Sequence, residues 1–266
     1  MAVVPGSSGA ILCCEKLTKA FGGLVAVKGV DMCIMPGERR SVIGPNGAGK
    51  TTLFNVINGE LKATSGKVFI RGKDVTHLPT HTRVKYGLAR TFQVTNLFPE
   101  STLHENVVLA LLGYRSAKFV CWRPLGSYNE LHGMADDLLD RFSLGDLREE
   151  RVANLSYGDQ RLLEVVLGMA ANPSILALDE PSSGLSGKET EKLVEVLNAL
   201  DRSIALLVIE HDMRVAFEVT DKMTVMYEGE VIADGPIDEV KNSPRVQEVY
   251  LGTRTKEVHP STGSRQ

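Results

Sequence analysis

Short apolar runs alternate with stretches of helical periodicity along most of the chain. In the N-terminal third, four apolar runs have the composition of strands, and the third of them ends in glycines. The predicted strands of this part are residues 11–17, 25–34, 40–43 and 66–71. Residues 51–58, between the last two, have the pattern of a helix.

The C-terminal half repeats the alternation with more strongly apolar strands. Residues 174–178 and 204–209 are rich in β-branched residues and leucine, as buried parallel strands are. Between them, one face of a predicted helix carries Leu193, Val194, Val196, Leu197 and Leu200. This order predicts a parallel sheet covered by helices. A hairpin follows, with strands 223–227 and 230–233 around a Glu228-Gly229 turn.

The segment between these halves has helical rather than strand periodicity, as at Val107, Val108, Leu111 and Leu112. We interpret residues 94–155 as a helical subdomain inserted into an α/β core made of residues 10–93 and 156–252. An irregular stretch, 114–128, is either a contact specific to the lineage or a solvated loop. Residues 1–9 and 253–266 are rich in small and polar residues and are expected to be flexible ends.

Composition limits the classes of function. The 266 residues are 43% hydrophobic, which is enough for one large domain with a buried core. The formal net charge of -3 gives no overall basic field for nucleic acid. No apolar run approaches the roughly 18 residues of a membrane span, and no signal peptide pattern is present. A role at a membrane would therefore require docking on another chain.

The four cysteines show no pattern of a metal site. Cys13, Cys14, Cys33 and Cys121 form no CxxC pair and have no histidine at metal-ligand spacing. We expect small, buried, unpaired residues in a reducing compartment.

A complete phosphate-binding loop lies between a predicted strand and a predicted helix. It consists of Gly44, Pro45, Asn46, Gly47, Ala48, Gly49, Lys50 and Thr51, and matches G-x-x-x-x-G-K-[ST]. Glycines let successive N–H groups turn toward phosphate oxygens, and the helix N-terminus adds its positive dipole end. Lys50 suits the β- and γ-phosphates, Thr51 suits Mg²⁺, and Thr52 continues the same helical turn. The loop predicts binding of a nucleoside triphosphate.

Two carboxylates follow the apolar strand 174–178. Asp179 is placed to hold the water shell of the metal, and Glu180 to orient or deprotonate the attacking water. His211 follows the next predicted strand, so its imidazole is expected at the same edge of the sheet. Taken alone, each could be a solvated strand end; the phosphate loop upstream favours the catalytic interpretation.

With these motifs the chain resembles the ATP-binding-cassette family over about residues 10–252. Leu155-Ser156-Tyr157-Gly158-Asp159-Gln160-Arg161 is similar to the family's signature motif, Gln93 to its glutamine loop, and Phe21 to the aromatic residue that stacks on adenine. The resemblance implies a P-loop NTPase core of cassette type, with a helical subdomain and an antiparallel β part. It also implies that Ser156 and Gly158 meet the γ-phosphate of a partner subunit, and that Gln93 couples the metal site to the helical subdomain.

The resemblance extends to the subgroup of branched-chain amino acid importers. It is carried by residues 21–31, 55–79 and 87–107, and by Ile209-Glu210-His211-Asp212-Met213. Two positions depart from the common family form: Tyr157 and Asp159 stand in the signature, and Ser186 stands where most relatives have Asp. The Ser186 loop normally communicates between the two sites of the dimer, so its departure bears on their coupling.

The resemblance implies an ATPase that uses ATP and Mg²⁺ and energises import from the cytoplasmic face of the membrane. Its implied partners are integral membrane permease subunits, a second ATP-binding subunit of the same or a different kind, and indirectly an extracytoplasmic solute-binding protein. Residues 95–99 and the following helix are expected to line the docking groove for the membrane subunit. Urea, amides and other amino-acid-like solutes remain alternative cargoes, and a soluble regulatory ATPase remains a rival function.

Overall fold

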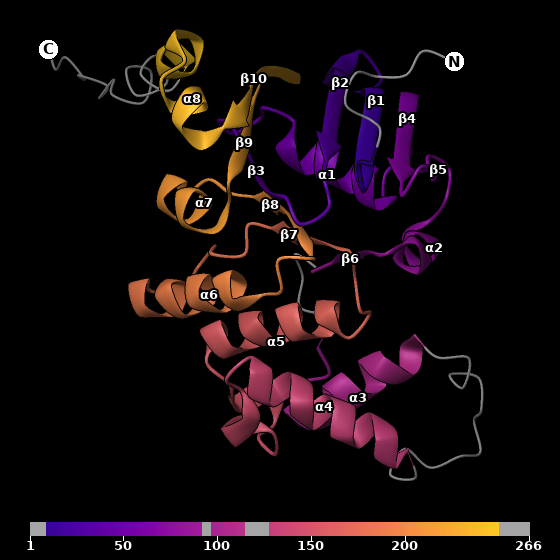
Figure 1. The fold of residues 1–266 in the computed structure, drawn as a ribbon, viewed down its shortest axis with the longest axis vertical. Helices are drawn as coiled ribbons and strands as arrows, with labels where there is room; N and C mark the ends of the chain where they lie inside the picture. The colour runs from indigo at the N-terminus through magenta and orange to yellow at the C-terminus, as the bar shows by residue number, and fades with distance from the viewer. Residues whose placement is uncertain (1–8, 92–96, 115–127, 250–266) are drawn as a thin grey trace, which may run out of the picture.

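The computed structural model describes residues 9–91, 97–114 and 128–249 (Figure 1). Its strands are β1 (Leu12–Phe21), β2 (Leu24–Ile34), β3 (Arg39–Ile43), β4 (Ser65–Ile70), β5 (Lys73–Asp74), β6 (Leu88–Arg90), β7 (Ile175–Asp179), β8 (Ala205–Ile209), β9 (Lys222–Tyr227) and β10 (Glu230–Pro236). Its α-helices are α1 (Lys50–Asn58), α2 (Thr80–Arg83), α3 (Leu103–Gly113), α4 (Asn129–Arg141), α5 (Tyr157–Met169), α6 (Gly187–Ala199), α7 (Met213–Val219) and α8 (Ile237–Lys241). Short 3₁₀ turns are η1 (Val84–Tyr86), η4 (Gly145–Leu147) and η5 (Val152–Asn154).

The strands form two sheets. The larger has the order β10-β9-β3-β8-β7-β6; its pairs from β9 to β6 are parallel, and β10 pairs antiparallel with β9. The smaller sheet is antiparallel, in the order β2-β1-β4-β5. All residues of β3, β7 and β8 are buried, which explains the nearly continuous apolar sequences of β7 and β8. In β3 the buried Arg39 and Arg40 have hydrogen-bond partners. The predicted parallel sheet, the antiparallel part and the C-terminal hairpin are confirmed.

Helix α1 lies between the two sheets and supplies much of the core there. Its buried residues Leu53, Phe54, Val56 and Ile57 pack with apolar side chains from β1, β2, β4 and the larger sheet. Arg83 is also buried, and its guanidinium donates to the carbonyls of Val56 and Ile57 at the C-terminal end of α1. The C-terminal end of the helix that follows the phosphate loop is thus held by Arg83.

The helices α3, α4, α5 and α6 form a layer on the opposite side of the larger sheet (Figure 1). α5 and α6 lie next to the sheet, and α3 and α4 lie beyond α5. One hydrophobic cluster runs continuously from Leu176 and Val208 in the sheet through Leu163 in α5 to Leu131 and Leu139 in α4. The helical layer therefore shares its core with the sheet.

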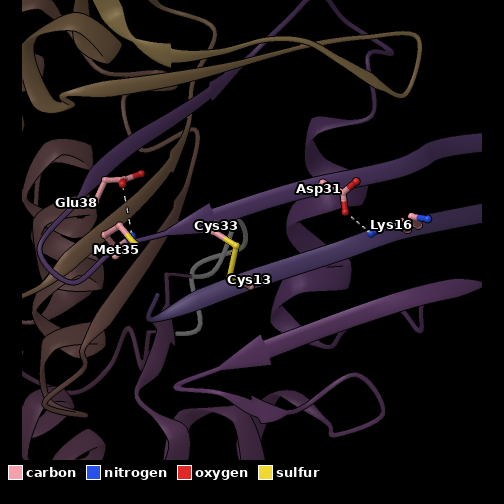
Figure 2. The surroundings of a disulfide bond; sticks show 6 residues. All are labelled: Cys13, Lys16, Asp31, Cys33, Met35 and Glu38. Carbon is pink, nitrogen blue, oxygen red and sulfur yellow. Dashed lines mark hydrogen bonds between the residues drawn. A yellow bond between two sulfur atoms is a disulfide. The ribbon is translucent and has the colours of Figure 1, made fainter. Parts of the chain in front are cut away.

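The expectation of unpaired cysteines is wrong for two of them. Cys13 in β1 and Cys33 in β2 are joined as a disulfide, and they are direct register partners with a Cα–Cα distance of 4.2 Å (Figure 2). Antiparallel pairing brings opposite side chains together, whereas a sequence separation of 20 residues gives no sign of it. Cys14 is buried and free, as expected. Cys121 lies outside the described residues.

Within the described residues, no helix combines the length and the apolar character that crossing a membrane requires.

Candidate nucleotide-binding site

The phosphate loop joins β3 to α1 and is packed tightly against neighbouring backbone. Gly44 and Gly49 have φ values of 153° and 98°. A Cβ atom at Gly49 would lie 2.2 Å from the carbonyl oxygen of Ala26 in β2, and one at Gly44 would lie 2.2 Å from that of Met226 in β9. Only glycine fits at either position, so β2 and β9 fix the path of the loop.

The first turn of α1 provides an anion-binding end. Its N-cap is Gly49, so no side chain caps the helix, and the positive end of its dipole is left for an external anion. Lys50 is buried, and its Nζ donates to the carbonyls of Gly44 and Pro45 at 2.8 and 3.1 Å. Burial lowers the pKa of Lys50, and the nearby charges of Glu180 and Asp179 oppose this effect. The ammonium group is therefore held in the centre of the loop.

A cavity of about 370 Å³ brings most of the predicted residues together. It is lined by Phe21, Leu24, Ala26, Asn46, Gly47, Ala48, Gly49, Lys50, Thr51, Thr52 and Glu180. Phe21, at the end of β1, is 46% exposed, and the ammonium of Lys19 lies 4.8 Å from its ring centroid. One cavity therefore combines an exposed aromatic ring, a phosphate-type loop and a carboxylate.

Asp179 ends β7 in a buried position. It is 4% exposed, and neither of its carboxylate oxygens has a hydrogen-bond partner in the described structure. Burial, followed by the charge of Glu180, raises its pKa to about 6. A buried carboxylate without protein donors needs another partner, and carboxylate and hydroxyl oxygens suit Mg²⁺. Asp179 and the cavity-lining Thr51 therefore fit the metal that the sequence predicts.

Glu180 and His211 follow adjacent parallel strands and lie near each other. Glu180 has a left-handed φ of 47°, and its N–H donates to the carbonyl of Ile209 at 2.9 Å. The Nδ1 atom of His211 is 3.8 Å from Oε2 of Glu180. The predicted pair thus meets at the carboxyl edge of the sheet, where ligands bind in open α/β folds.

Glu210 is a positioning residue to which the sequence analysis assigned no role, although it names Glu210 within the subgroup motif. It is fully buried, burial raises its pKa, and it accepts hydrogen bonds from the backbone N–H groups of Ser182 and His211 at 3.0 and 3.2 Å. It thereby ties the loop after Glu180 to the loop that carries His211. The available sequence signal was an acidic residue at the end of a fully apolar strand.

Comparisons with known proteins identify the family of a chain with this site. The family model described as "ABC transporter" matches residues 27–183, which is more than half of the chain. This chain belongs to the ABC transporter family. A second model, "Branched-chain amino acid ATP-binding cassette transporter", matches residues 230–255. The family resemblance and the expectation of an ATPase that works in transport are confirmed.

Curated relatives align with nearly the whole of this ABC cassette. The high-affinity branched-chain amino acid transport ATP-binding protein LivG of Escherichia coli is 37% identical over 91% of this chain and 98% of that protein. BraF of Pseudomonas aeruginosa, which has the same description, is 36% identical over 89% of this chain and 95% of that protein. A probable LivG of Archaeoglobus fulgidus is 36% identical over 93% and 98%.

Solved structures confirm the cassette fold. The ADP conformation of MJ1267, an ATP-binding cassette of an ABC transporter, matches with a TM-score of 0.79 at 31% identity, over 91% of this chain and 99% of that one. The dimeric cassette MJ0796 bound to ADP and Pi matches with a TM-score of 0.71 at 27% identity, over 85% of this chain and 98% of that one.

The signature residues of this ABC cassette lie at the start of α5, and they do not line the cavity of their own chain. Ser156 caps the helix: its Oγ accepts from the Asp159 N–H at 3.1 Å and donates to the Asp159 carboxylate at 2.8 Å. The N–H of Gly158 donates to Oε1 of Glu189 in α6 at 3.0 Å. Both groups therefore have partners within the chain. Gln93, the predicted glutamine-loop residue, lies outside the described residues.

Proposed function

We propose that the chain is the ATP-hydrolysing subunit of an importer of branched-chain amino acids. The observation that supports it best is the convergence of Phe21, Lys50 and Glu180 on one cavity, beside a buried Asp179 without partners. The subgroup model and the printed descriptions of the relatives favour branched-chain amino acids over urea or amides. The proposed location is the cytoplasmic face of the membrane, on the permease subunits.

In this proposal the nucleotide is ATP with Mg²⁺. Phe21 stacks on the adenine, and Lys50 exchanges its loop carbonyls for phosphate oxygens. Bound Mg²⁺ neutralises negative charge on the phosphates. Glu180 orients the attacking water. His211 and Gln93 are the other proposed catalytic residues beside the γ-phosphate. Thr51 and Asp179 hold the metal, with Gln93 as a further ligand.

A second cassette completes the proposed site. The signature residues Ser156 and Gly158 do not line their own cavity, whereas they lie at the N-terminus of α5, whose positive dipole end suits a phosphate. In a head-to-tail pair they would meet the γ-phosphate held by the partner. The solved dimeric cassette MJ0796 supports pairing in this family. The partner is either a second copy or a related chain, and a solute-binding protein acts through the permease.

The docking surface for the permease is proposed to be a groove between β6, α3 and α5. The groove has a volume of about 340 Å³. Its wall includes Phe98 and Tyr114, which are 56% and 50% exposed although both are large and apolar. Apolar side chains at such exposure beside a groove are typical of a contact surface. Of residues 95–99, the described part from 97 onward contributes Leu97 and Phe98.

The test is Glu180→Gln in the purified chain. We expect Mg²⁺-dependent ATP hydrolysis to fall by about 10²- to 10⁴-fold, because the amide cannot act on the attacking water. ATP binding should survive, because Lys50 and the loop are untouched. Hydrolysis is measured by phosphate release, and binding by equilibrium titration. Glu218→Gln, at an exposed position on α7, is the matched control. Loss of ATP binding in Glu180→Gln would contradict the assigned role.

A further inference from the structure

The groove between β6, α3 and α5 has polar groups in its wall, and most of them already have partners. The side chain of Asn106 accepts from the Phe98 N–H at 2.8 Å and donates to the carbonyls of Phe98 and Thr102. Arg90 is paired with Glu60 at 2.7 Å. These groups stabilise the groove itself, so they offer little for the recognition of an occupant.

Glu164 differs from them. It lies on α5, lines the groove and is 6% exposed. Its Oε2 accepts from Nη1 of Arg161 at 2.9 Å, whereas Oε1 is buried and has no hydrogen-bond partner in the described structure. A carboxylate accepts up to about four hydrogen bonds, and a buried acceptor left without a donor is costly. Burial raises the pKa of Glu164, which agrees with an environment that lacks a second donor.

The same carboxylate is linked to the signature motif through one side chain. Nη2 of Arg161 donates to the hydroxyl of Tyr157 at 2.7 Å, and the guanidinium lies 5.1 Å from the tyrosine ring centroid. Tyr157 is 42% exposed and is one of the two signature residues that the sequence analysis singles out as departures. Tyr157, Arg161 and Glu164 therefore form one connected series along α5, from the signature end to the groove.

We propose that the permease segment that occupies this groove carries a Lys or Arg side chain whose cation donates to Oε1 of Glu164. The rest of that segment is apolar, to match Leu97, Phe98, Leu109 and Leu167. Charge complementarity supports a cation over a neutral donor, because a buried carboxylate gains most from a charged partner. This inference rests on the proposed function, and it specifies which kind of permease side chain binds the proposed docking groove.

The series from Glu164 to Tyr157 gives the contact a second consequence. A cation on Oε1 would share the carboxylate with Arg161, which stays on Oε2 and is also the hydrogen-bond donor to Tyr157. Occupation of the groove therefore acts on the side chain that orients the signature tyrosine.

The experiment is recovery of membrane chains with the tagged protein from solubilised membranes of the source organism, quantified by mass spectrometry. Glu164→Gln keeps an acceptor for Arg161 but removes the charge, and we expect recovery of permease chains to fall at least tenfold. Glu191→Gln, at an exposed position on α6, is the control and should recover as much as the wild type. Equal recovery with Glu164→Gln overturns the cation proposal. No permease recovery with the wild type overturns the proposed function instead.

Two further measurements distinguish loss of the contact from a folding defect of the Glu164→Gln variant. Melting temperature and ATP binding of Glu164→Gln should match the wild type. If they do not, the double variant Arg161→Met with Glu164→Met removes both charges of the pair together and should show the same loss of recovery. In the recovered permease, Gln in place of the contacting basic residue should cause no further loss in the Glu164→Gln background. If the losses of recovery caused by the two substitutions add in full, the proposed contact between Glu164 and the basic residue is contradicted.

Discussion

Asp179 and Glu180 are adjacent in the sequence but have opposite environments. Asp179 is the last residue of a buried strand and has no hydrogen-bond donor in the described structure. The side chain of Glu180 is 30% exposed, and its backbone turns into the left-handed region. The chain therefore keeps one carboxylate buried, where the proposed function places the metal, and leaves the other open to the cavity. The metal-free protein is expected to lose stability by burying the first.

Asp179→Asn is expected to stabilise the metal-free protein. The folded pKa of Asp179, about 6, lies above its ordinary value of 3.8. Its ionised form therefore opposes folding above pH 6, and this effect disappears as the pH falls below 3.8. We expect an increase of about 3 kcal/mol in the free energy of unfolding at pH 7.5 and almost none at pH 3.5, together with loss of ATP hydrolysis. Urea unfolding at both pH values measures this free energy. An equal increase at pH 7.5 and pH 3.5 would contradict the raised pKa of Asp179.

At the scale of elements, the N-termini of α5 and α6 are joined. Ser186 caps α6 in a capping box with Glu189, and the Glu189 carboxylate also accepts from the N–H of Gly158 at the start of α5. Asp159 pairs with Lys192 at 2.9 Å. Ser186 therefore has a local structural role as the cap of α6. The signature amide in turn is held by a carboxylate from the neighbouring helix.

Glu189→Gln tests whether this carboxylate competes with the nucleotide. In the assembled transporter the γ-phosphate of the partner's ATP and Glu189 would be two anions at one N–H. Removal of the charge is expected to lower the apparent KM for ATP about threefold, with kcat little changed. The measurement is ATPase kinetics of the membrane-recovered complex, with Glu191→Gln as control. A higher KM would show that Glu189 supports the closed site.

At the scale of the whole molecule, one apolar cluster connects the helical layer to the larger sheet. It contains the buried leucines of α4 as well as buried residues of β7 and β8. The nucleotide cavity is lined instead by residues of the smaller sheet, the phosphate loop and α1, together with Glu180. The helical layer and the sheet should therefore unfold together, although only the sheet carries the phosphate loop.

Leu131→Ala tests this shared core. Leu131 is 1% exposed and lies in α4, away from the nucleotide cavity. Truncation in a packed core is expected to cost about 3 kcal/mol. We expect a single transition at a lower temperature by circular dichroism, with ATP affinity at 20 °C unchanged. Two separate transitions would show that the helical layer is an independent folding unit.

The sequence predicted the parts of the site that are contiguous in the chain. The phosphate loop, the strand that ends in Asp179 and Glu180, and the position of His211 follow from local patterns, because strand burial and turn chemistry are encoded within a few residues. The strands, including the antiparallel hairpin, were predicted for the same reason. The short edge strands β5 and β6 were not, because two or three residues carry too little periodicity.

Only the tertiary structure decided the contacts between distant segments. The Cys13–Cys33 pair depends on the register of β1 and β2, and the two hydrogen bonds of Glu210 depend on the adjacency of β7 and β8. The Gly158–Glu189 contact depends on how α5 packs on α6. In each case the partners are ordinary residues in the sequence. They acquire their roles because strand register and helix packing bring particular atoms within hydrogen-bonding distance, and no local pattern encodes that distance.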